Sequence, residues 1–143
     1  MCDSTIILPD LAATERLAAR LAGMVRPGMA VLLEGPLGAG KSAVCRAVLR
    51  SLLGDPALDV PSPTFTLVQS YDTPRGPVHH LDLWRLAGPE GLDELGLDDM
   101  LRDIVLVEWP DRLGRHAPAN ALGLRLSILD ADARAAVLIG WTG

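Results

Sequence analysis

The residues with the clearest chemistry lie in positions 35–42, which read Gly-Pro-Leu-Gly-Ala-Gly-Lys-Ser and match the phosphate-binding pattern G-x-x-x-x-G-K-[ST]. Glycines there let successive backbone N–H groups turn towards phosphate oxygens, which a Cβ would obstruct. Lys41 is the only lysine in a chain with 13 Lys and Arg residues, and its compact ammonium suits the β- and γ-phosphates of a nucleotide. The pattern predicts a nucleotide site lined by Leu37, Gly38, Ala39, Gly40, Lys41, Ser42 and Ala43.

Two acidic residues end candidate strands and could serve the Mg²⁺ of such a site, together with the hydroxyl of Ser42. Glu108 ends the apolar run 104–107 and has no cation near it in sequence. A buried carboxylate there would be costly unless it met a metal or its waters, so we expect a metal ligand and keep an exposed strand end as the alternative. Asp82 could be the general base or an anchor for the metal, or it could pair with Arg85 or cap the next turn.

The histidine pair, one tryptophan and one polar loop have weaker signals. His79 and His80 are adjacent on a candidate strand, so they face opposite sides and cannot bind one ion together. By the same period His80 shares a face with Asp82. Trp109 follows Glu108 and could stack on a base or close over the site, although such tryptophans are often core residues. A rigid polar loop that could sense a γ-phosphate, or be only a turn, contains Ser62, Pro63 and Thr64.

A strand, a loop and a helix must position the glycine-rich segment. Residues 29–33 form a continuous apolar run typical of a strand buried on both faces, and residues 42–53 carry apolar side chains at helical spacing. Gly54 closes that helix. Before them, residues 6–8 predict a short strand, and Pro9 and Asp10 open a helix that ends at Pro27 and Gly28.

The remaining elements complete a sheet. Five prolines in residues 56–77 exclude a helix, and Phe65, Leu67 and Tyr71 fall on one face of an alternating segment that leads into a strand. Turn chemistry at residues 72–77 and a strand at 78–83 indicate a hairpin. Short helices at 90–102, a buried strand at 104–107 and an antiparallel pair at 122–128 and 135–141 follow. This order predicts a three-layer α/β fold with ligands at the carboxyl ends of the strands.

Size and composition narrow the class of protein. A chain of 143 residues fits one domain, and its net charge of −5 without a basic cluster argues against a large nucleic-acid surface. Cys2 and Cys45 lack any metal-binding spacing, so we expect both to be reduced. No apolar run approaches the roughly 18 residues of a membrane span. We therefore expect a cytoplasmic protein without membrane contact.

Four segments, in this order and at this spacing, resemble the TsaE (YjeE) family: residues 35–42, 62–68, 80–86 and 107–110. The resemblance covers nearly the whole chain and implies a P-loop NTPase-like fold with a mixed central sheet. It implies a small bacterial ATPase that binds Mg²⁺ and ATP, hydrolyses ATP slowly and works with the proteins TsaB and TsaD. Those partners place threonylcarbamoyl on adenosine 37 of tRNA, so the family member resets the complex and meets tRNA only indirectly.

The resemblance also implies roles for individual residues. Lys41, Ser42 and Ala43 would hold the triphosphate and Mg²⁺, Glu108 would be a magnesium ligand, and Asp82 would be needed for hydrolysis. Further roles implied in this way are a switch loop at Ser62, Pro63 and Thr64, a border of the nucleotide at Trp109, and adenosine contacts at Asp10, Thr14 and Arg134. The chain departs from the family pattern at Pro36, Ser42 and Trp84, and only Trp84 puts a feature in doubt, namely partner contact or loop packing.

Two rival functions remain open. A small-metabolite kinase would transfer the γ-phosphoryl group to a hydroxyl and needs an arginine-bearing lid, for which Arg112 and Arg115 are the candidates. The residues after them have the pattern typical of strands, and no helical spacing there predicts a lid. A nucleotide-gated adaptor would bind ATP and partners without meaningful turnover. A GTPase is disfavoured because the single Asn120 is followed by Ala121, not by the Lys of a guanine-reading motif.

Overall fold

The computed structural model describes residues 4–61, 63, 66–86, 90–118 and 121–140, and a seven-stranded sheet runs through this part of the chain. Its strands are β1 (Ser4–Leu8), β2 (Ala30–Glu34), β3 (Val68–Thr73), β4 (Gly76–Asp82), β5 (Ile104–Glu108), β6 (Ala121–Ile128) and β7 (Arg134–Ile139). In the sheet they follow the order β1-β7-β6-β2-β5-β4-β3. The four central strands, β6, β2, β5 and β4, run parallel to one another. On either side of them, β7 is antiparallel to β6 and β3 is antiparallel to β4.

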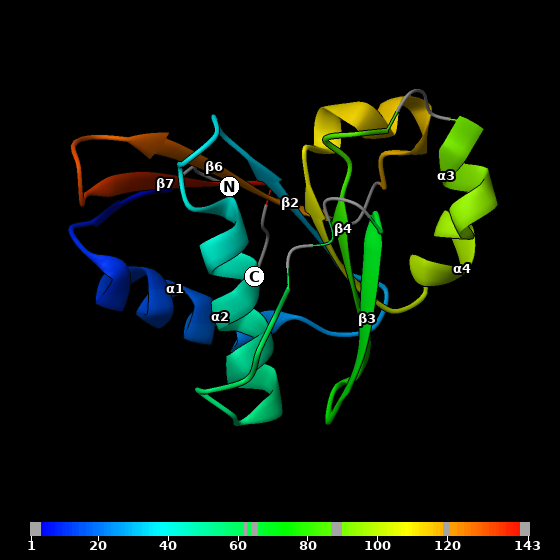
Figure 1. The fold of residues 1–143 in the computed structure, drawn as a ribbon, viewed down its shortest axis with the longest axis horizontal. Helices are drawn as coiled ribbons and strands as arrows, with labels where there is room; N and C mark the ends of the chain where they lie inside the picture. Colours follow the sequence, from blue (N-terminus) through cyan, green and yellow to red (C-terminus); the bar gives the residue numbers. More distant parts are fainter. Residues whose placement is uncertain (1–3, 62, 64–65, 87–89, 119–120, 141–143) are drawn as a thin grey trace.

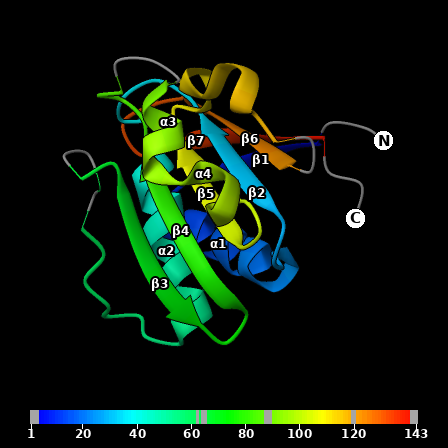
Figure 2. The same ribbon diagram turned by 90° about the vertical axis from the view of Figure 1, so that its right-hand side faces the viewer.

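Helices cover both faces of this mixed sheet (Figures 1 and 2). They are α1 (Leu11–Met24), α2 (Lys41–Leu53), α3 (Glu90–Leu95), α4 (Leu97–Met100) and the 3₁₀ helix η1 (Pro110–His116). The protein has a hydrophobic core on each face of the sheet, and alternate residues of β5 belong to different cores. Ile104 and Leu106 pack with α1 and α2, whereas Val105 and Val107 pack with α3, α4 and η1. The sheet is therefore buried between two hydrophobic layers, as expected for strands whose residues alternate between faces.

Local signals explain the two helices that flank the nucleotide loop. The Asp10 Oδ1 atom accepts a hydrogen bond from the Ala13 N–H at 2.9 Å and caps α1. Gly54 ends α2 in the left-handed conformation, with φ 65°, and its N–H bonds back to the last turn. The predicted start of α1 and the predicted end of α2 are therefore confirmed, whereas α1 ends at Met24, before the predicted end at Pro27 and Gly28. No helix within the described residues is both long and apolar enough to cross a membrane.

The approach to β3 differs from the sequence prediction. The strand begins only at Val68, because Leu67 adopts a left-handed φ of 69° and its N–H bonds to the Pro63 carbonyl. Leu67 packs against the core beneath α3 and α4, whereas Tyr71 packs against the core beneath α1 and α2. The prediction that both lie on one face is therefore wrong, since the turn at Leu67 breaks the alternation; Phe65 lies outside the described residues.

The 3₁₀ helix η1 has no periodic signal in the sequence. It starts at Pro110, whose fixed φ suits a first helical position, after Trp109 in the left-handed region. Gly114 interrupts it with φ 53° and ψ −125°. Leu113 packs into the core beneath α3 and α4, so burial of this one side chain anchors the segment. The last predicted strand also ends earlier than expected, at Ile139, and Trp141 lies outside the described residues.

Candidate functional site

The glycine-rich loop connects the central strand β2 to α2 and forms one wall of a cavity of about 430 Å³. Gly35, Gly38 and Gly40 all have positive φ, and a Cβ on Gly35 would lie 2.6 Å from the Leu126 carbonyl oxygen. All three positions favour glycine for conformation, and Gly35 requires it for space as well. The opposite wall comes from the carboxyl ends of β4 and β5, which bring Asp82 and Glu108 to the same cavity. Leu37 of the loop and Ala43 in the first turn of α2 line it as well, while Ala39 is buried in the core behind the loop.

Lys41 is buried and is held by the loop that it follows. Its Nζ atom donates to the carbonyl oxygens of Gly35 and Pro36, the second at 3.0 Å, and lies 4.0 Å from the centre of the Trp109 ring. Burial lowers the pKa of Lys41 below its ordinary value, and the negative charges of Glu108 and Asp82 partly oppose that effect. The ammonium is therefore a poorly hydrated cation beside two acids, well suited to meet an anionic ligand.

Ser42 and Glu108 place two hard oxygen ligands side by side. The Ser42 hydroxyl donates to Glu108 Oε1 at 2.8 Å across 66 positions of sequence, and both residues line the cavity. Neighbouring ligands around octahedral Mg²⁺, at about 2.0–2.1 Å from the ion, lie about 2.9 Å apart. Hydroxyl and carboxylate oxygens are also the donors that Mg²⁺ prefers. The residues present therefore fit a magnesium ion.

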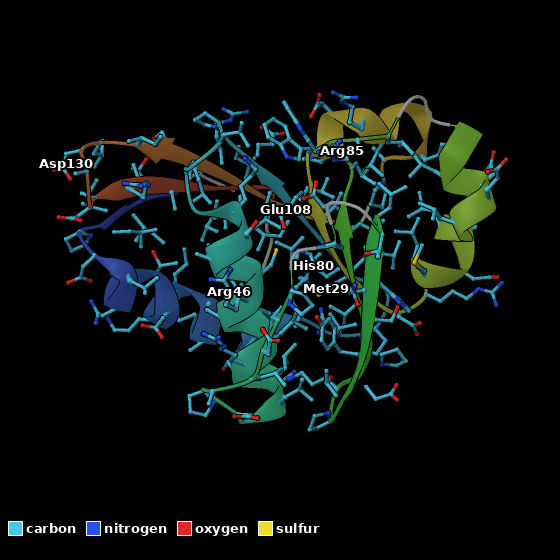
Figure 3. The ribbon with its side chains drawn as sticks, in the orientation of Figure 1. Met29, Arg46, His80, Arg85, Glu108 and Asp130 are labelled. Atoms are coloured by element: carbon cyan, nitrogen blue, oxygen red, sulfur yellow. The ribbon has the colours of Figure 1, made fainter. Side chains whose placement is uncertain are left out.

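Three polar side chains gather on the face of the sheet covered by α2. In the register of β4 and β5, Asp82 lies opposite Glu108, and His80 lies two residues before Asp82 on the same face. The His80 Nε2 atom lies 2.7 Å from Glu108 Oε2, and both residues are buried, with exposed fractions of 1% and 2%. Figure 3 shows these two labelled side chains on neighbouring strands beside α2. His79 points the other way, as predicted, and contacts Ser70 and Asp103.

Asp82 also shapes the chain that follows β4. One of its carboxylate oxygens, Oδ1, accepts a hydrogen bond from the Trp84 N–H at 3.0 Å, which is the turn-capping contact that the sequence left as an alternative. The side chain is nevertheless only 5% exposed and lines the cavity. Asp82 therefore caps a turn and faces the ligand space at the same time.

Cys45 joins the buried group from α2, and its sulfur lies within 4.8 Å of ligand atoms on His80 and Glu108. Burial raises the pKa of the Cys45 thiol well above its ordinary value, and the charges of Glu108 and Asp82 raise it further. A neutral thiol is a poor metal ligand, because metals bind the thiolate. Cys45 is therefore a core residue beneath the site.

Trp109 lies directly over the cavity in an unusual backbone conformation, with φ 61° and ψ 55°. Its ring contacts that of Trp84, with centroids 4.4 Å apart, as well as the Lys41 ammonium. A left-handed conformation in a bulky residue is strained, and such strain is concentrated at functional sites. The backbone turn at Trp109, directly after β5, thus places an aromatic ring against the glycine-rich loop.

A second cavity of about 370 Å³ adjoins the first and shares Gly40 and Ala43 with it. Asp10, Thr14 and Arg134, which the family resemblance places near adenosine, all line this second cavity. The Arg134 Nε atom donates to the Gly38 carbonyl at 3.2 Å and so ties β7 to the loop. The fold therefore brings these three distant positions to one side of the loop.

The expected switch loop is placed only in part. Pro63 is buried, whereas Ser62 and Thr64 lie outside the described residues. Sequence reasoning missed the contact between His80 and Glu108, although the period-two alternation put His80 on the face of Asp82. It also missed Trp84 and Arg85 as cavity residues, because they follow the end of β4 in a turn without regular spacing.

Comparison with known proteins gives consistent matches over this whole region. The sequence profile described as "Threonylcarbamoyl adenosine biosynthesis protein TsaE" matches residues 8–136. The tRNA threonylcarbamoyladenosine biosynthesis protein TsaE of Rickettsia bellii is 36% identical over 135 residues, which cover 94% of this chain and 93% of the relative. Its Aquifex aeolicus counterpart is 33% identical over 129 residues, or 90% of each chain. The crystal structure of Bacillus subtilis YdiB aligns with a TM-score of 0.76 and 25% identity, covering 96% of this chain and 84% of that chain.

Proposed function

The chain belongs to the TsaE family and participates in the biosynthesis of threonylcarbamoyladenosine in tRNA, and we propose that it acts there as the Mg²⁺-dependent ATPase. In this proposal, residues 1–143 work as one P-loop ATPase domain in the cytoplasm. The domain binds and slowly hydrolyses ATP to reset a complex of TsaB and TsaD, the proteins that carry out the transfer. It meets tRNA only through that complex and is not itself the transferase.

The observation that carries the proposal is the pairing of Ser42 with Glu108 at the end of the glycine-rich loop. Their oxygens lie 2.8 Å apart in the cavity that also contains Lys41. A hydroxyl, a carboxylate and a buried ammonium around one cavity suit a metal-bound triphosphate. After η1 the described chain continues as the strands β6 and β7 without a helical lid, which favours water as the acceptor over a metabolite hydroxyl.

Each residue around the cavity has a distinct part in the proposal. The backbone N–H groups of Leu37 to Ala43 and the start of α2 bind the phosphate oxygens. Lys41 exchanges its contacts with the Gly35 and Pro36 carbonyls for the β- and γ-phosphates. Ser42 and Glu108 hold Mg²⁺, which when bound neutralises charge on the transferring phosphoryl group. Asp82 orients or deprotonates the attacking water, for which its position opposite Glu108 is suitable.

The remaining contacts define the nucleoside side. Asp10, Thr14 and Arg134 border adenosine in the second cavity, and Trp109 closes the first cavity beside the phosphates. The loop at Ser62, Pro63 and Thr64 acts as the switch that responds to the γ-phosphate. Leu37 and Trp84 are exposed apolar side chains at the mouth of the site, with exposed fractions of 68% and 41%.

Reconstitution of the modification with TsaB, TsaD and tRNA tests this function. We expect Lys41→Ala to abolish multiple-turnover modification, and Asp82→Asn to retain ATP binding while losing hydrolysis. Full multiple-turnover modification by Lys41→Ala would refute the ATPase role. If Asp82→Asn supports full modification while its ATPase activity is lost, the chain is a nucleotide-gated adaptor whose turnover is dispensable.

A further inference from the structure

The buried imidazole of His80 makes one described contact at the site, and that contact is with the carboxylate of Glu108. Its Nε2 atom lies 2.7 Å from Glu108 Oε2, while the Ser42 hydroxyl donates to the other carboxylate oxygen at 2.8 Å. Glu108 is therefore held at both oxygens by two side chains from different elements, β4 and α2. Nothing in the activity proposed above requires a histidine at this place.

The two ring nitrogens of His80 lie in different surroundings. Nε2 shares a hydrogen bond with Glu108 Oε2, and it would be the donor with Glu108 acting as a metal ligand, because an ionised carboxylate only accepts hydrogen bonds. The other ring nitrogen, Nδ1, is buried and has no hydrogen-bond partner in the described part of the chain. A buried polar atom without a hydrogen-bond partner destabilises the fold. An apolar side chain of similar size would avoid that cost in a position flanked by core residues, which indicates that the ring serves Glu108.

We propose that His80 is a positioning residue that fixes the Glu108 carboxylate in the orientation needed to bind Mg²⁺ together with Ser42. This inference rests on the proposed function. A free glutamate side chain loses rotamer entropy on being fixed, and one hydrogen bond from Ser42 leaves the carboxylate able to turn about it. The second hydrogen bond, from the opposite side, removes that freedom before the metal arrives. When the Ser42 oxygen binds the ion, the contact from His80 remains.

Glutamine and asparagine provide a matched pair of substitutions at this position. The amide nitrogen of glutamine reaches about as far as imidazole Nε2, so His80→Gln keeps a donor for Glu108. The shorter His80→Asn is polar as well but does not reach, and His80→Leu removes the donor while keeping most of the volume. His79→Leu is the control on the same strand, because His79 lies on the other face, 2.8 Å from Ser70 and Asp103 side-chain atoms.

The measurement is the dissociation constant for ATP by calorimetry, once with saturating Mg²⁺ and once with EDTA. The ratio of the dissociation constant in EDTA to that in Mg²⁺ measures how much the metal strengthens ATP binding. It separates this contribution of the metal from that of the fold. We expect His80→Leu and His80→Asn to reduce this ratio about 10–100-fold, the usual effect of losing a residue that orients a metal ligand. We expect His80→Gln to stay within about threefold of the parent protein and His79→Leu to match it.

Several results would overturn the inference. An unchanged ratio in His80→Asn would show that Glu108 needs no second support, and equal losses with Mg²⁺ and with EDTA would show that the ring only stabilises the fold. If His80→Leu does not fold, the comparison of His80→Gln with His80→Asn decides alone. A parent protein that binds ATP no better with Mg²⁺ than with EDTA would refute both this role and the proposed magnesium site. A failure confined to the His80 variants refutes the positioning role only.

Discussion

Trp109 offers a test of whether backbone strain positions the aromatic wall of the site. Its φ of 61° and ψ of 55° lie in the left-handed region, which side chains with a Cβ disfavour. We consider two substitutions, Trp109→Ala and Trp109→Gly. Both remove the contacts of the ring with Lys41 and Trp84, but only glycine adopts this conformation without strain.

The expected difference between the two variants follows from opposing effects. The left-handed conformation costs alanine about 1–2 kcal/mol. Glycine gains freedom in the unfolded chain, which favours alanine by about 0.4–1 kcal/mol. The net expectation is that Trp109→Gly is more stable than Trp109→Ala by about 0.8 kcal/mol, within a range of about 0–1.6 kcal/mol, or about 2–3 °C in Tm for a chain of this size. The sign is opposite to that in regular helices and strands, where glycine is usually the less stable residue.

Urea denaturation of both variants, with the midpoint compared at equal slope, measures this difference. Both should be less stable than the parent protein, because the cation–π contact and the ring pair contribute about 0.5–2 and 0.5–1.5 kcal/mol. A Trp109→Ala variant that is more stable than Trp109→Gly would refute the strained conformation. It would also remove the argument that the turn after β5 is held in place for the ligand.

Two further predictions concern the loop and the turn beside it. Gly35→Ala should lower the free energy of unfolding by about 1–3 kcal/mol in urea titrations, because its Cβ would lie 2.6 Å from the Leu126 carbonyl oxygen; an unchanged midpoint would contradict the close packing. Backbone hydrogen bonds from Ala133 and Asp132 lower the pKa of Asp130 below its ordinary 3.8. The ionised carboxylate therefore stabilises the fold above pH 3.8, and this stabilisation is lost as the pH falls through the lower pKa of the folded state. Acid titration should therefore show the stability advantage over Asp130→Asn shrinking below about pH 4, and a constant difference would count against these hydrogen bonds.

The sequence was sufficient for the elements that carry a local signal. The apolar run of β2, the glycine loop and the helical spacing after it predicted the strand, loop and helix around Lys41. The end of β5 at Glu108 followed from an uninterrupted buried run. These signals lie within short segments, so a single sequence is enough to predict the elements from them.

The parts that sequence reasoning missed depend on contacts between distant segments. The approach of His80 to Glu108 spans 28 positions and depends on the parallel register of β4 and β5. The left-handed turns at Leu67 and Trp109 occur in residues without a turn signature, so propensity favours extended backbone there. Tertiary packing overrides that preference, and it decides where β3 begins and how Trp109 leaves β5.

The most direct test of the account is a calorimetric titration of the folded chain with ATP and Mg²⁺, with TsaB and TsaD present in a parallel experiment. We predict a saturable one-site heat for the parent protein and its loss in Lys41→Ala, which removes the cation that the loop now holds beside Glu108 and Asp82. No heat from the parent protein under either condition, or an equal heat from Lys41→Ala, would contradict the nucleotide site.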